Sequence, residues 1–323
     1  MYDSITLYLD KSYLPGGATD FDRLLLPLLE CITQDSKVGG RYWGNLGSIR
    51  IRVDPYSMKV SGSFPKWYLG DNLQTISRRQ TKEAISALSD TLSLPMNRAK
   101  VVRFDTAANL VMKHPLDLYF ARLGELCRYK RIPLPSGVEY RQHRRELSFY
   151  DKIAEMKTKR ETIPDLYRYQ HIIRYEARYL HDLPGLLKLP EIRGETLYND
   201  TFYQAMVQRW KSGYNAIQKT IPNNESKPMK DRIKTPKDLE KYLAYKGLQN
   251  TGEAEIRGLI KELQNTKSID KMQAQRMRTK LDEIKAGVEL CDNSKGDELL
   301  TELDEAINAA AVINGIGGAN KKG

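Results

Sequence analysis

Tyr150 and Lys152 lie two residues apart in the sequence SFYDK, which spans residues 148–152. In a β-strand, residues at this spacing leave the same face, about 7 Å from each other. A phenol can attack phosphorus as a nucleophile, and a neighbouring ammonium group favours the phenolate and neutralises charge in the transition state. The spacing therefore makes Tyr150 and Lys152 candidate catalytic residues for phosphodiester chemistry.

Two carboxylates occur in two other segments that alternate like strands. Asp105 follows Arg103 at a spacing of two, and Glu176 has Arg174 and Arg178 at the same spacing on either side. Carboxylate oxygens bind hard divalent cations, which polarise phosphate oxygens, and guanidinium groups bind phosphates directly. If the three strands are neighbours, the sequence predicts an Mg²⁺ or Mn²⁺ site at Asp105 and Glu176, with the three arginines contacting DNA.

The same residues also have a purely structural interpretation, as cross-strand ion pairs and a tyrosine in a strand. The four histidines form no H-x-H or H-x-x-x-H pair. His143 and His171, each just upstream of one of these segments, are candidates for an additional metal ligand or an acid/base group.

The elements that must position these residues are predicted from their periodicity. The order of strands and helices favours an α+β fold with a largely antiparallel sheet and helices packed on one side. Beyond about residue 196 the strand pattern disappears, and a Pro- and Asn-containing linker at 222–228 precedes a helical region. The predicted strands are 5–9, 48–53, 59–64, 101–112, 145–153 and 172–179, and the predicted helices are 20–33, 81–92, 116–126, 201–220, 253–264, 269–286 and 297–313.

The predicted organisation is a catalytic domain at 1–221, a helical region at 222–313 and a disordered tail at 314–323. A chain of 323 residues with 40% hydrophobic residues has enough material for about two domains with a core, which excludes wholesale disorder. No apolar run approaches the length of a membrane span, and the opening lacks a signal peptide. We expect a cytoplasmic protein with no membrane partner.

The charge balance is strongly basic, with 52 Lys and Arg against 41 Asp and Glu and a net charge of +11. A solvated basic surface and a phosphate-rich partner both account for this excess. Three scattered cysteines without a CxxC pair argue against a disulfide framework and a structural zinc site. Trp43, Trp67 and Tyr68 are candidates for stacking on nucleic-acid bases, although large aromatic residues more often pack in a core.

The sequences VRFD at 102–105, SFYDK at 148–152 and IRYEAR at 173–178, in this order, resemble the gene II/X family of phage and plasmid replication proteins. Members of this family are rolling-circle replication initiators. The opening MYDSI and the sequence GSFPKWY at 62–68 add to the resemblance, which extends over roughly residues 1–200.

The resemblance implies a metal-dependent DNA-nicking endonuclease and strand transferase that acts on single-stranded or supercoiled origin DNA. A tyrosine would cut one strand, leaving a 5′-phosphotyrosyl link and a free 3′-hydroxyl for a host polymerase, with a host helicase as a further partner. By the same resemblance Tyr150 is the nucleophile and Asp105 and Glu176 are metal ligands. The supporting cations are Lys152, Arg103 and Arg174.

The sequence lacks the His-hydrophobic-His pair found in many related nickases, and a single tyrosine stands in a Tyr-x-Lys context. Metal ligation by the two carboxylates is therefore an inference that departs from the pattern of those nickases. A two-tyrosine termination scheme has no support in the sequence, which leaves the number of catalytic tyrosines open. Two alternatives remain open: a mobilisation relaxase that nicks an origin of transfer, and a non-enzymatic initiator or repressor that binds an origin without cutting it. A covalent protein–DNA adduct would exclude the second.

Overall fold

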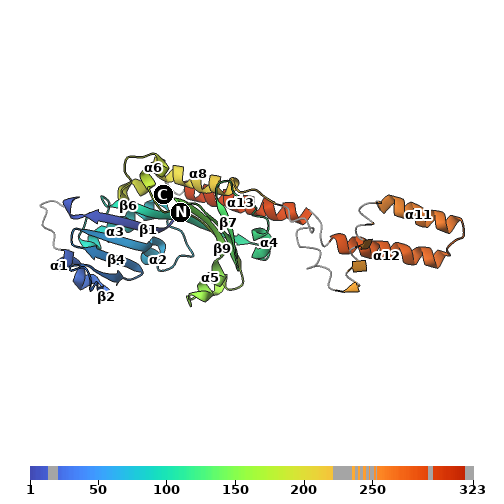
Figure 1. Ribbon diagram of the computed structural model, residues 1–323, viewed down its shortest axis with the longest axis horizontal. Coiled ribbons are helices and arrows are strands. Elements are labelled where there is room, and N and C mark those ends of the chain that lie inside the picture. Colours follow the sequence, from blue (N-terminus) through green and yellow to red (C-terminus); the bar gives the residue numbers. More distant parts are fainter. Residues whose placement is uncertain are drawn as a thin grey trace, which may run out of the picture. The chain divides into compact units, whose positions relative to one another are not determined.

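The computed structural model describes residues 1–13, 21–220, 235–236, 239–240, 243–244, 247, 251, 253–289 and 294–316. By its internal contacts the chain divides into two compact units. The first contains Met1–Lys219 together with the described residues from Leu300 onward, and the second is Thr220–Leu299. Within the second unit, α11 (Glu253–Asn265) and α12 (Lys271–Glu289) pack side by side (Figure 1).

The first unit is built on a ten-stranded sheet in the order β2-β3-β4-β5-β1-β6-β10-β9-β8-β7. Every neighbouring pair is antiparallel, which confirms the predicted α+β class and the largely antiparallel sheet. The strands are β1 (Tyr2–Asp10), β2 (Glu30–Gln34), β3 (Tyr42–Leu46), β4 (Ile49–Asp54), β5 (Ser57–Ser63), β6 (Lys100–Met112), β7 (Lys130–Leu134), β8 (Gly137–Arg141), β9 (Arg145–Asp151) and β10 (His171–Tyr179).

Short helices connect the strands of this unit, and two longer ones pack over the sheet. The longer ones are α3 (Arg78–Leu92) and α8 (Asp200–Asn215). Ser77 begins α3 with a capping box, in which its hydroxyl accepts from the Gln80 amide and the Gln80 side chain accepts from the Ser77 amide. The short helices are α1 (Phe21–Leu25), α2 (Phe64–Leu69), α4 (Leu116–Phe120), α5 (Lys152–Thr158), α6 (Leu183–Leu187) and α7 (Gly194–Leu197).

The core lies between the sheet and α8. The rings of Phe149 and Tyr175 stack at 4.2 Å, and the Tyr175 hydroxyl donates to the Trp210 carbonyl on α8 at 2.9 Å. Phe104 and Tyr179 stack in the same way at 4.6 Å. Because side chains alternate along a strand, the residues directly before and after each of these aromatic residues leave the opposite face of the sheet.

The C-terminal part of α13 (Ser294–Ile316) belongs to the first unit and runs beside α8 (Figure 1). Tyr214 on α8 donates to Asp304, and the Gln204 side chain donates to the Gly315 carbonyl at 2.7 Å. The helix extends past its predicted end at 313 into the predicted tail, whose residues after 316 lie outside the described part of the chain. The domain boundaries at 221, 313 and 323 stay predictions.

Several predicted elements differ from the structure. The predicted strand 145–153 ends at Asp151, because the Asp151 side chain accepts a hydrogen bond from the Ala154 amide at 2.9 Å and caps α5. The predicted helix 20–33 is instead α1, a short 3₁₀ turn and β2. Strands β2, β3, β7 and β8 were not predicted. None of the helices in the described ranges has the length and apolar character needed to cross a bilayer.

Candidate active site

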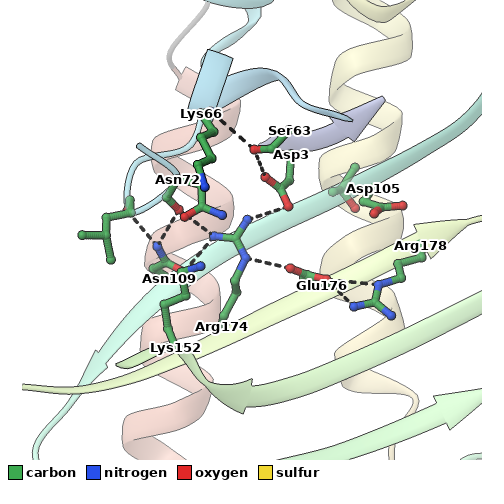
Figure 2. A network of polar contacts seen from close by, with 12 residues as sticks. Asp3, Ser63, Lys66, Asn72, Asp105, Asn109, Lys152, Arg174, Glu176 and Arg178 are labelled. Atoms are coloured by element: carbon green, nitrogen blue, oxygen red, sulfur yellow. Dashed lines mark hydrogen bonds and ion pairs between the residues drawn. The ribbon is translucent and has the colours of Figure 1, made fainter. Parts of the chain in front are cut away.

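Strands β6, β10 and β9 are neighbours, as the predicted site requires. In their antiparallel register Arg178 pairs with Asp105, Arg174 with Tyr150, and Glu176 with Ser148. Directly paired residues point to the same face of a sheet. The face opposite α8 therefore carries the predicted tyrosine, both predicted carboxylates and the predicted arginines. Figure 2 shows Asp105, Arg174, Glu176 and Arg178 of this set.

Tyr150 is bound to one of these carboxylates. Its hydroxyl donates a hydrogen bond to Glu176 Oε1 at 2.7 Å. Burial raises the pKa of Tyr150 well above its usual value, and the negative charge of Glu176 raises it further. The phenol is therefore protonated, and it donates this proton in the hydrogen bond to the carboxylate.

Glu176 is held between two arginines (Figure 2). Arg174 Nε donates to Oε1 at 2.7 Å, and Arg178 Nη2 donates to Oε2 at 2.9 Å. Burial alone would raise the pKa of Glu176, but the two guanidinium groups hold this pKa below its usual value. Glu176 is consequently an ionised carboxylate inside the protein.

Asp105 is the less firmly bound of the two carboxylates. It has one guanidinium partner, Arg103, whose Nη2 and Nε donate to its two oxygens at 2.9 and 3.2 Å. The side chain of Asp105 is 3% exposed and that of Arg103 is 43% exposed. Burial raises the pKa of Asp105 to about 6, against the effect of Arg103, and repulsion from Glu176 adds to the increase. The two carboxylates are thus close enough to interact electrostatically.

Arg174 lies behind the site rather than at its surface. Its side chain is fully buried, and Nη2 forms an ion pair with Asp3 at 2.9 Å. Nη1 donates to the Asn72 carbonyl and the Asn109 side chain, both at 3.0 Å (Figure 2). A buried guanidinium with these partners cannot reach a DNA strand without leaving them, so the geometry favours a positioning role over the predicted DNA contact.

Lys152 does not share a strand face with Tyr150, since it is the first residue of α5. It is fully buried, and its Nζ donates to Glu155 Oε2 at 2.7 Å. Burial lowers the pKa of Lys152, and the positive charge of Arg174 acts in the same direction. The predicted strand placement of Lys152 is wrong, and its catalytic role stays a prediction.

An open cavity of about 570 Å³ lies over this network. Among the predicted site residues, its walls include Tyr150, Asp105, Glu176, Arg103 and Arg178. Lys152 and Arg174 are not lining residues. The exposed side chains of His143 and His171 are not in the walls either, so the structure gives no support for a histidine ligand.

The walls also contain four acidic residues that were not predicted as site residues: Asp3, Glu139, Glu155 and Glu161. Glu139 lies on β8 and forms ion pairs with Arg141 at 2.8 Å and Arg178 at 3.5 Å. A short alternation at 137–141 was the available signal for β8. Asp3 lies where the pairing of β1 with β6 shifts register, between Tyr2 and Ile5. The periodicity of the sequence does not reveal such a shift.

The donor set is compatible with a divalent cation that keeps most of its water. The described residues contain no group of three or more His, Cys, Asp or Glu side chains able to hold a metal ion. Asp105 and Glu176 offer two carboxylates that repel each other, and Mg²⁺ often takes one or two carboxylates together with water and phosphate oxygens. A cation bound to both carboxylates would displace the half-exposed Arg103 from Asp105 and Arg178 from Glu176 Oε2.

Guanidinium groups bind phosphates and a phenol can act as a nucleophile, so this cavity contains the groups needed to bind and attack a phosphate ester. A family model described as the N-terminal part of a phage replication-associated protein matches residues 47–215. The chain belongs to this family of phage replication proteins, which confirms the predicted resemblance to the gene II/X family. A comparison with curated proteins finds no match. The family supports a role as a replication initiator.

Proposed function

We propose that this chain starts rolling-circle replication by nicking one strand of an origin. The Tyr150 oxygen attacks the scissile phosphorus, an O–P bond forms, and the bond from phosphorus to the 3′ oxygen breaks. The products are a 5′-phosphotyrosyl link and a 3′ end that takes up a proton and serves as a primer. The hydrogen bond from Tyr150 to Glu176, in a replication-protein family, is the observation that supports this proposal.

Glu176 accepts the phenol proton as the tyrosine oxygen attacks. Because the pKa of Tyr150 is raised, this attack needs an acceptor already in contact with the hydroxyl. Arg174, which forms an ion pair with Asp3, keeps that acceptor in position on the same face of the sheet. Arg178 and Arg103, which reach the cavity, bind the non-bridging phosphate oxygens and stabilise the charge that develops on them.

We further propose that Asp105 and Glu176 hold Mg²⁺ or Mn²⁺ during the reaction. When bound, the cation polarises a phosphate oxygen. The substrate is single-stranded origin DNA, or supercoiled duplex that melts locally, since a phosphate in regular duplex seldom meets a fixed phenol in line. A host helicase and polymerase would then use the primer end.

The experiment that tests the nucleophile is the reaction of the full chain with a labelled single-stranded origin oligonucleotide. The wild-type protein should form a covalent adduct, detected by denaturing gel and located at Tyr150 by mass spectrometry. Tyr150→Phe should fold and form no adduct. Tyr169→Phe is the matched control, because Tyr169 is 89% exposed. An adduct in the Tyr150→Phe variant would overturn the assignment.

Two other tyrosines near the motifs are poor substitutes for Tyr150. The hydroxyl of Tyr140 donates to the Gly124 carbonyl at 2.8 Å, and that of Tyr175 donates to the Trp210 carbonyl. Both rings are fully buried. Cleavage without any adduct would instead indicate hydrolysis by an activated water, and binding without cleavage would favour the non-enzymatic alternative.

A further inference from the structure

The strands on the N-terminal side of the sheet have one apolar face and one basic face. On β4, Ile49, Ile51 and Val53 are buried, whereas Arg50 and Arg52 are exposed. On β5 the same alternation buries Met58 and Val60 and exposes Lys59. The buried residues belong to the core, so the exposed residues must lie on the opposite side of the sheet.

The strand register joins these exposed residues into one surface. Arg52 pairs with both Trp43 on β3 and Lys59 on β5, and Lys59 pairs with Tyr8 on β1. Paired residues share a face, so these side chains are neighbours. We call this surface the basic sheet face, defined by Trp43, Arg50, Arg52, Lys59 and Tyr8.

The basic sheet face continues directly into the candidate active site. On β1, Thr6 pairs with Arg103 of β6, and Arg103 lines the cavity. Ser4 and Ser63, which pair with each other on β1 and β5, line the cavity as well. A strand of DNA with one phosphate beside Tyr150 can therefore follow the exposed residues of the sheet from β6 to β3.

The charges on this surface are available to a ligand. Neither Arg50 nor Lys59 forms an ion pair with any residue that the structure describes, and Arg52 shares the carboxylate of Asp54 with Arg41. The Arg50 guanidinium lies over the Trp43 ring at 5.8 Å. This contact holds the indole in place beside two exposed cations, an arrangement suited to base stacking next to phosphate binding.

We propose that the basic sheet face binds the single-stranded DNA on one side of the scissile phosphate. Bases stack on Trp43 and Tyr8, and phosphates contact Arg50 and Lys59. Four strand spacings separate β3 from β6, so the track is about 19 Å long. Aromatic side chains on a flat sheet meet unpaired bases more readily than the stacked bases of a duplex. This inference rests on the proposed function and specifies how the same site receives its substrate.

The test measures binding separately from cleavage. The full chain carrying Tyr150→Phe is titrated, in chelator, against a fluorescent single-stranded origin oligonucleotide at several salt concentrations. Adding Arg50→Glu and Lys59→Glu should weaken binding roughly tenfold or more and reduce the slope of log K against log salt by about 1.4. The control has the same charge change at exposed Lys82 and Lys188, outside the basic sheet face, and should keep the original slope.

Trp43 provides a second, spectroscopic measurement. Single-stranded DNA should quench the tryptophan fluorescence of the Tyr150→Phe chain, and Trp43→Phe should remove most of that quenching while circular dichroism shows intact folding. Trp43→Ala should weaken binding about tenfold. The proposal would be overturned if the variant with Arg50→Glu and Lys59→Glu bound DNA like the Lys82/Lys188 control. It would also be overturned if the quenching persisted without Trp43.

The outcomes also separate this inference from the proposed function. If the wild-type chain forms the Tyr150 adduct, and the Arg50/Lys59 variant binds normally and also nicks normally once Tyr150 is restored, the DNA runs elsewhere and the nicking proposal stands. If the basic sheet face binds single-stranded DNA as expected but no adduct forms, the track is supported and the chemistry is wrong. Failure of the wild-type chain to bind single-stranded DNA would overturn both.

Discussion

Tyr150 and Glu176 share a 2.7 Å hydrogen bond that couples a protonated phenol to an ionised, buried carboxylate. The same Glu176 oxygen accepts from Arg174, so the tyrosine, the carboxylate and the buried arginine form one unit. A substitution at any member should affect both activity and stability. Because these residues differ in burial and charge, substitutions at different positions of the site separate the two effects.

Glu176→Gln should abolish nicking and destabilise the fold. The amide cannot take the phenol proton. Arg174, whose side chain is fully buried, would keep one carboxylate partner, Asp3. We expect a loss of about 2–4 kcal/mol in the free energy of unfolding, because a buried cation loses part of its compensation. Urea unfolding measures this loss, with Glu83→Gln on α3, where the side chain is 39% exposed, as the control. A Glu176→Gln protein of unchanged stability would show that Asp3 alone compensates Arg174.

Asp105→Asn should abolish nicking and stabilise the fold at pH 8. The folded-state pKa of Asp105 is raised from 3.8 to about 6, so the charged form is the unfavourable one in the folded protein. Above pH 6 the wild type bears this cost, which the amide removes, with an expected gain of about 1–3 kcal/mol. The gain should disappear as the pH falls from 6 to 4, where the folded carboxyl is protonated.

Unfolding measured in chelator at pH 8 and at pH 4.5 checks this sign. Arg103 loses an ion pair in the variant, but its side chain is 43% exposed and regains water. Destabilisation by Asp105→Asn at pH 8 would mean that the bidentate contact with Arg103 outweighs the cost of burial.

Removal of divalent cations should stop nicking and leave DNA binding nearly unchanged. Binding relies on Lys and Arg contacts with phosphates, whereas the proposed cation acts on the scissile phosphate. Adduct formation is measured after dialysis against chelator and again after Mg²⁺ or Mn²⁺ is restored. Full activity in excess chelator would show that Arg103 and Arg178 supply the positive charge without a metal.

The open face of the site could be predicted from the sequence because it depends on strand periodicity. Two-residue spacing correctly placed Asp105, Tyr150 and Glu176 on one face. It also separated Arg174 and Arg178 from Tyr175, which leaves the opposite face. This spacing is a local property, and it holds wherever a strand is regular. These residues then come together if β6, β10 and β9 are neighbours in the sheet, as they are.

Two parts of the site depend on information that periodicity lacks. The end of β9 depends on a cap, since the Asp151 side chain binds the Ala154 amide and turns Lys152 into a helical residue. The depth of Arg174 depends on tertiary contacts with Asp3 and Asn72, which are distant in sequence. A pattern of alternating residues indicates which face a side chain leaves, but not whether another segment covers it.

The C-terminal part of α13 should be needed for the stability of the first unit, and the segment before it should not. Leu303 and Ile307 are buried, and Glu302 accepts a hydrogen bond from Tyr119 on α4 at 2.5 Å. Burying two such side chains contributes about 3–6 kcal/mol, as an upper estimate. A chain that ends at Ile221 should therefore unfold at a lower urea concentration than the full chain and expose apolar surface.

The matched comparison deletes residues 225–295 and joins the ends with a short Gly/Ser linker. Within the first unit, the segments on either side of this deletion are joined by the hydrogen bond from Tyr214, near the end of α8, to Asp304 in α13. This variant should keep the unfolding midpoint of the first unit and still form the Tyr150 adduct on a single-stranded origin oligonucleotide. If instead the chain ending at Ile221 matches it in stability and activity, the predicted catalytic domain 1–221 is sufficient and the packing of α13 contributes little.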